Sequence, residues 1–102
     1  MAADLYGIEN WGGDYFSVSE KGEVQTSIGS GDTSCCVSLM DIVSGLGVRG
    51  LDLPVLLRFS DILDSRIAKL NDAFRRAMSD AGYSGEYRGV YPIKVNQQQQ
   101  VI

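Results

Sequence analysis

A long amphipathic helix between two short apolar runs constrains the fold of this 102-residue chain more than any other feature. Within residues 60–81, apolar side chains recur at helical spacing and form one broad face. They are Ile62, Leu63, Ile67, Leu70, Phe74, Ala77 and Met78. Ser60 is a good N-cap, acidic residues follow it in the first turn, and Gly82 suits the C-cap. The pattern therefore predicts a helix over Ser60–Ala81.

The runs on either side of this helix predict β-strands. Residues 54–59 form a compact apolar run with one charge, and residues 87–95 are rich in β-formers. Pro92 donates no backbone hydrogen bond, so it belongs near the end of the second strand. The order strand, helix, strand favours an α/β architecture with parallel pairing. Lys94 would then lie at the carboxyl end of its strand, where the reactive groups of such folds gather.

Lys94 is the candidate catalytic residue of the chain. A lysine among apolar neighbours is costly to hold charged, so burial lowers its pKa. The free amine can attack a carbonyl carbon and form a Schiff base. The alternative, which the spacing alone favours, is a lysine that extends from a strand end into water.

The first half of the chain predicts smaller elements. Residues 14–18 and 23–27 are expected to pair as a hairpin around the turn cluster Ser19–Gly22, after a turn at Gly12 and Gly13. Residues 29–34 read as a loop, and they lack the lysine of a phosphate-binding loop. Residues 37–46 have apolar spacing typical of one helical face, with Ser34 as a possible cap. We therefore predict that residues 1–52 form an N-terminal segment with a hairpin and one helix. Residues 53–102 would form the start of a second domain.

Composition excludes several functions. The net charge of −4 and the pI near 4.6 argue against nucleic-acid binding, and no apolar run is long enough to span a bilayer. The basic residues Arg66, Lys69, Arg75 and Arg76 fall on the far side of the long helix, where a solvated face is expected. Cys35 and Cys36 are adjacent, and the chain has no second pair of cysteines, which favours reduced thiols in the cytosol. Two cysteines without a histidine are also too few ligands for a structural zinc site. Trp11 is expected to pack against another surface.

Three stretches of the chain resemble one enzyme family. Residues 87–97, YRGVYPIKVNQ, resemble the cofactor-lysine segment of the biosynthetic arginine decarboxylases. Residues 50–63 look like the segment that precedes it, and residues 6–16 resemble the start of that family. The stretches occur in the family's order. The family uses pyridoxal phosphate and has an alanine-racemase-like barrel, so the resemblance implies an α/β fold. In it, an N-terminal β-containing segment would precede the first strand-helix-strand of an incomplete, PLP-binding TIM-type barrel.

The resemblance also implies a reaction. The family converts L-arginine to agmatine and carbon dioxide in polyamine and spermidine biosynthesis, a route of arginine catabolism in the cytoplasm. The lysine that matches Lys94 carries pyridoxal 5'-phosphate, and Asn96 and Gln97 flank the site. The family is also described as requiring magnesium (Mg2+), and no acidic cluster here is assigned to it. A full-length member is expected to be a homo-oligomer, with no nucleic-acid or membrane partner.

The length of the chain conflicts with a complete barrel, which needs roughly 250 residues. We therefore expect an N-terminal fragment, inactive alone and poorly folded, since an unfinished barrel leaves a sheet edge and an apolar helix face uncovered. The chain has no histidine, so the family's ring-stacking histidine is missing. Two alternatives stay open: a decarboxylase for another basic amino acid, and a non-catalytic interaction fragment that pairs with an intact subunit.

Overall fold

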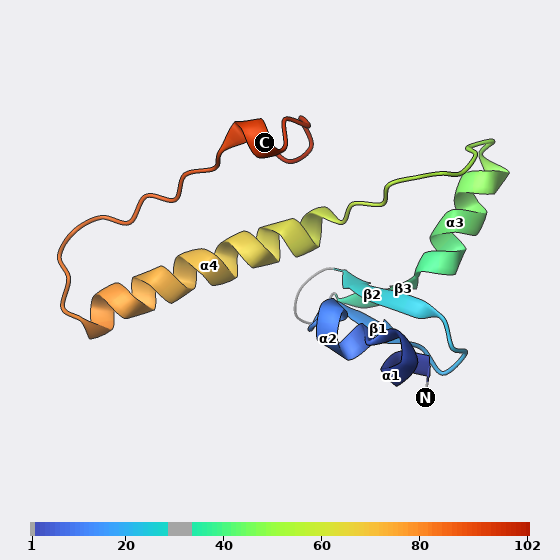
Figure 1. Ribbon diagram of the computed structural model, residues 1–102, viewed down its shortest axis with the longest axis horizontal. Helices are drawn as coiled ribbons and strands as arrows, with labels where there is room; N and C mark the ends of the chain where they lie inside the picture. The colour runs from blue at the N-terminus through green and yellow to red at the C-terminus, as the bar shows by residue number, and fades with distance from the viewer. Residues whose placement is uncertain (1, 29–33) are drawn as a thin grey trace. The chain divides into compact units, whose positions relative to one another are not determined.

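The computed structural model describes residues 2–28 and 34–102 as two compact units (Figure 1). The first unit runs to Asp64, and the second comprises Ser65–Ile102. The mixture of helices and an antiparallel sheet confirms the coarse α/β class.

The sheet of the first unit is antiparallel and has the order β1 (Phe16–Val18), β2 (Val24–Ile28), β3 (Cys35–Ser38). In β1 and β2, Phe16 lies opposite Thr26, so the predicted hairpin is confirmed. Gly22 adopts a φ of 80° in the connecting turn, a conformation that favours glycine. β3 pairs with the other edge of β2, and it begins after the loop predicted at residues 29–34, of which residues 29–33 lie outside the described residues.

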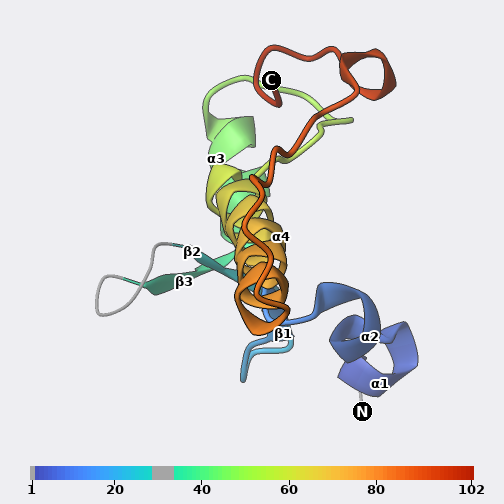
Figure 2. The ribbon, with the colours of Figure 1, turned by 90° about the vertical axis from the view of Figure 1, so that its left-hand side faces the viewer.

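Two short helices, which the sequence analysis did not predict, precede the sheet: α1 (Ala2–Tyr6) and α2 (Ile8–Gly12) (Figure 2). α2 packs against β1 at Gly12, where an added Cβ would lie 3.0 Å from the Phe16 Cβ. The Trp11 and Phe16 rings lie 5.6 Å apart, so Trp11 does pack against a neighbour although 58% of it is exposed. The close approach at Gly12 explains why this position excludes a side chain.

The core of the first unit is very small. Among the described residues of the whole chain, only Ile8, Gly12 and Thr26 are buried. The hydroxyl of Thr26 is fully enclosed and donates to the Tyr15 carbonyl oxygen at 3.0 Å. A buried hydroxyl needs such a partner, so this bond ties β2 to the chain that enters β1.

Helix α3 (Leu39–Val48) is displaced from its predicted range of residues 37–46. Val37 belongs to β3, where it pairs with Thr26, so the helix cannot begin before the strand ends. The cap is Ser38 rather than Ser34: its hydroxyl accepts from the Met40 amide at 3.2 Å and donates to a Glu23 carboxylate oxygen at 2.8 Å. Sheet pairing therefore decided which serine caps the helix.

Helix α4 (Ser60–Asp80) confirms the predicted long helix. The helix ends at Asp80, and Gly82 follows with a φ of 63°. The Tyr83 amide donates to the Met78 carbonyl at 2.8 Å, and the Gly82 amide donates to the Ser79 carbonyl at 3.1 Å. These two bonds form a Schellman motif, as a glycine cap predicts. The basic residues predicted on the solvated face are exposed, but Ile67 is also 50% exposed and Phe74 47%. No helix in the described ranges is long and apolar enough to cross a membrane.

The prediction of a strand on each side of this helix is wrong, because neither segment forms a strand. Residues 54–59 belong to no sheet, and residues 87–95 contain only the 3-10 helix η2 (Ile93–Val95). β-forming residues make a strand only when a neighbouring strand accepts and donates the ladder hydrogen bonds. The three strands among the described residues pair only with one another, all antiparallel, so the predicted parallel pairing is not observed and the barrel is not confirmed.

Candidate functional site

Lys94 lies at the centre of η2 in the second unit. The Val95 amide donates to the Pro92 carbonyl at 3.0 Å, and the Asn96 amide donates to the Ile93 carbonyl at 3.2 Å. Each bond joins residues three apart, the spacing of a 3-10 turn. Pro92 precedes the turn with a φ of −77°, close to the value that its ring imposes.

A side-chain hydrogen bond joins the two residues that flank this turn. The Tyr91 hydroxyl donates to the Asn96 carbonyl oxygen at 3.1 Å, so the two residues bracket residues 92–95. The Asn96 side-chain oxygen in turn accepts from the Gln98 amide at 3.1 Å. Sequence reasoning placed Asn96 beside the site but missed the role of Tyr91, because a contact across five residues has no periodic signal.

The burial expected for Lys94 is not present. Lys94 is exposed, and the apolar neighbours Ile93 and Val95 are 53% and 67% exposed. The strand that would have enclosed them does not form, because no second strand lies against this segment. The exposure of Lys94 therefore agrees with the alternative prediction, a lysine that extends into water.

An aromatic stack attaches the segment after α4 to the helix. The rings of Phe74 and Tyr87 lie 4.5 Å apart between centroids, with 12° between their planes. The segment runs back alongside α4 (Figures 1 and 2), and at Gly89 an added Cβ would approach the Tyr87 hydroxyl to 3.2 Å. The stack therefore fixes the chain seven residues before Lys94.

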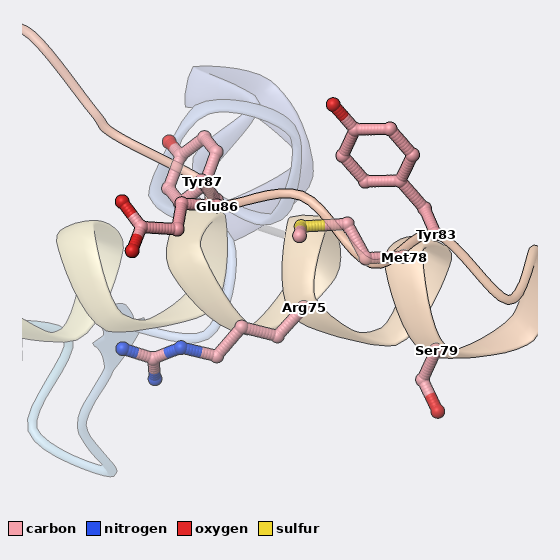
Figure 3. Close-up of a pocket in the computed structure, with 6 residues that line it drawn as sticks. All are labelled: Arg75, Met78, Ser79, Tyr83, Glu86 and Tyr87. Atoms are coloured by element: carbon pink, nitrogen blue, oxygen red, sulfur yellow. The ribbon is translucent and has the colours of Figure 1, made fainter.

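An open hollow of about 460 Å³ lies between the end of α4 and this returning segment (Figure 3). Its lining residues are Arg75, Met78, Ser79, Tyr83, Glu86 and Tyr87. Arg75 forms an ion pair with Asp72 at 3.3 Å and Glu86 one with Arg88 at 2.7 Å, all of them largely exposed. Figure 3 shows Ser79 and Tyr83 pointing in different directions, so the side chains do not converge on one ligand position. Lys94 does not line this hollow.

Metal-ligating side chains do not gather in the part of the chain that the structure describes. Groups of three or more histidine, cysteine, aspartate or glutamate residues that could hold an ion are absent from these residues. Cys35 and Cys36 are free and exposed on β3, as expected for reduced thiols. Lys94 thus presents an exposed amine within a turn that the Tyr91 hydroxyl closes.

Comparison with known proteins identifies close relatives. The chain is 46% identical over 101 residues to the biosynthetic arginine decarboxylase of Prochlorococcus marinus, with 99% of this chain and 15% of the relative covered. It is 46% identical over 101 residues to that of a Synechococcus species and 47% identical over 98 residues to that of Thermosynechococcus vestitus. These alignments cover 99% and 96% of this chain, and 16% and 15% of the relatives.

The chain is similar to the biosynthetic arginine decarboxylases. The resemblance inferred from three stretches thus extends over almost all 102 residues and includes Lys94. The chain spans about 15% of the length of these arginine decarboxylases, which by name are lyases that remove a carboxyl group. No family model and no solved structure matches it.

Proposed function

We propose that this chain forms the lysine-bearing part of a decarboxylase that converts L-arginine to agmatine and carbon dioxide in polyamine biosynthesis. The observation that carries the proposal is the identity of 46% over 99% of the chain with proteins named biosynthetic arginine decarboxylase. A lyase of this kind in the cytoplasm accords with the composition, which predicts reduced thiols.

Lys94 would hold pyridoxal 5'-phosphate. Its exposed primary amine suits bonding to the aldehyde carbon of that cofactor with loss of one water. When bound, the cofactor supplies an electron sink for the pair left behind by carbon dioxide. Lys94 would hold the cofactor through its amine, and the turn around it would set the position of that amine.

Other parts of the expected site do not fit the residues in hand. The chain has no histidine to stack on the cofactor ring. The described residues contain no cluster for magnesium, so no step is assigned to that ion. Both facts support the proposal that an active enzyme needs more residues than these 102.

The proposed full-length setting is a barrel in a homo-oligomer, with residues 1–52 as an N-terminal segment and residues 53–102 as the start of the barrel domain. The apolar residues 54–59 support it, because such a run can form a strand once a partner strand is present. α4 would be the crossover helix that leads from residues 54–59 to the segment with Lys94.

A chimera tests the proposed function. The matching stretch of the Thermosynechococcus vestitus arginine decarboxylase is replaced by this chain, and agmatine release from L-arginine is measured with pyridoxal phosphate present. The chimera is expected to be active, Lys94→Arg in it to be inactive, and Lys21→Arg to match the parent chimera. A soluble, folded chimera that is inactive, or an active Lys94→Arg variant, would contradict the proposal. Lysine and ornithine in the same assay test the alternative of another basic amino acid.

The exposed apolar residues of α4 favour the second candidate function, an interaction fragment. Leu70, at 56% exposed, lies with Ile67 and Phe74 on the apolar face of α4. Such a face suits burial against the rest of a decarboxylase subunit. Co-purification of the chain with an intact relative, persisting in Lys94→Ala and lost in Leu70→Asp, would support this role; co-purification lost in Lys94→Ala would contradict it.

A further inference from the structure

The turn that carries Lys94 has few internal hydrogen bonds. Two backbone bonds, from Val95 to Pro92 and from Asn96 to Ile93, hold it. A three-residue 3-10 helix is a marginal structure, because its hydrogen-bond geometry is poorer than that of an α-helix. Water can also compete for these bonds, since the segment is exposed. The turn therefore needs a further constraint if it is to hold one conformation.

The Tyr91 hydroxyl supplies such a constraint. It lies on the N-terminal side of the turn and donates at 3.1 Å to the carbonyl of Asn96 on the C-terminal side. This bond encloses both backbone bonds and Lys94 within one ring. The Asn96 side chain is held in addition by the Gln98 amide, so the acceptor end is itself fixed.

We propose that Tyr91 is a positioning residue for Lys94: its hydroxyl closes the turn on Asn96 and so orders the amine for bonding to an aldehyde. The consequence for the cofactor rests on the proposed function, whereas the closure of the turn does not. Tyr91 does not touch the reacting atoms. It acts through the backbone on either side of Lys94, and ordering the turn in advance reduces the entropy lost when the adduct forms.

The variant Tyr91→Phe tests the closure, because it removes the hydroxyl and keeps the ring. Tyr83→Phe is the matched control: it removes a hydroxyl from another exposed tyrosine, at the end of α4. The readout is the carbonyl ¹³C shift of Asn96 in the labelled 102-residue chain. Tyr91→Phe is expected to move this resonance upfield and Tyr83→Phe to leave it in place. An Asn96 resonance that does not move in Tyr91→Phe overturns the proposal.

The effect on Lys94 is measured with pyridoxal phosphate as the probe. The neutral amine adds to the aldehyde carbon, one water leaves, and borohydride then delivers hydride to that carbon while solvent protonates the nitrogen. Peptide mass spectrometry of the trapped product compares Lys94 with the exposed Lys21 in the same molecules. The Lys94-to-Lys21 ratio at equilibrium is expected to fall about threefold in Tyr91→Phe, the scale of one exposed hydrogen bond, and to stay unchanged in Tyr83→Phe.

The two proposals fail in different ways. An unchanged labelling ratio in Tyr91→Phe overturns the positioning role, even if the chimera decarboxylates arginine. A chimera that decarboxylates arginine with Lys94→Arg overturns the proposed function, and the change of ratio between the unmodified chain and Tyr91→Phe still decides whether Tyr91 positions Lys94.

Discussion

Phe74 and Tyr87 stack almost in parallel, with ring centroids 4.5 Å apart. The two residues belong to different parts of the second unit: Phe74 to α4, and Tyr87 to the segment that returns beside it. Offset stacking of this kind adds about 0.5–1.5 kcal/mol to the free energy gained by burying the rings. The pair is therefore a principal attachment of the chain that leads to Lys94.

Replacing Phe74 by alanine should release that segment. Trypsin cleaves after Arg88, next to the stack, and this cleavage should accelerate by roughly two- to tenfold in Phe74→Ala, the factor that corresponds to the stacking energy. Cleavage after Arg49, in the first unit, is the internal reference. Tyr83→Ala removes an aromatic ring that does not stack in the described structure, so it should leave the rate near that of the unmodified chain. Equal rates after Arg88 in all three proteins would show that the stack does not hold the segment.

A glycine inside α3 and a glycine that follows α3 should respond to alanine in opposite directions. Gly45 lies inside the helix, and an added Cβ would meet no atom within 4 Å, so Gly45→Ala should stabilise α3 by about 0.5–1 kcal/mol. Gly50 follows the helix with a φ of 75°, so Gly50→Ala should destabilise its end by about 1 kcal/mol. Amide hydrogen exchange at Arg49, which donates to the Gly45 and Leu46 carbonyls, should slow in the first variant and quicken in the second. The same sign in both variants would contradict this.

Removing the Ser38 hydroxyl should fray the start of α3. Ser38→Ala loses the acceptor for the Met40 amide and the donor to Glu23, and loss of an N-cap destabilises a helix by about 1 kcal/mol. Exchange of the Met40 amide should therefore quicken by about fivefold. Ser44→Ala, an exposed position inside the same helix, is the control and should leave this exchange unchanged or slower. Ser38→Asn should restore much of the protection, because asparagine also caps helices.

The 102-residue chain by itself is expected to release no agmatine. Lys94 is exposed, the chain has no histidine, and the hollow beside α4 does not include Lys94. With pyridoxal phosphate and L-arginine added, agmatine production should equal that of Lys94→Ala within error. Production that exceeds this control and depends on arginine would show that these residues suffice for the reaction.

The sequence predicted best the elements whose signals are local. The helix over Ser60–Asp80 carries its own periodic apolar face and terminal glycine, and the hairpin of β1 and β2 carries its turn residues. It also marked Lys94, although through resemblance rather than through spacing. These signals need only the residues within one or two turns of the chain.

Elements that depend on partners distant in the sequence could not be predicted from local sequence signals. Val37 has a helical pattern, but pairing with Thr26 makes it part of β3 and moves the start of α3 to Leu39. Residues 54–59 and 87–95 have strand-forming side chains, but none of the strands among the described residues pairs with either of them. A strand is a property of two segments, so composition cannot predict it without the partner.

The sequence by itself thus determined the long helix, its ends, the first hairpin and the family resemblance that includes Lys94. The tertiary structure alone decided that Lys94 is exposed in a 3-10 turn and that the Tyr91 hydroxyl closes this turn on Asn96. The physical reason is that burial and side-chain hydrogen bonds depend on which atoms meet in space, whereas periodicity and turn residues depend only on neighbours along the chain.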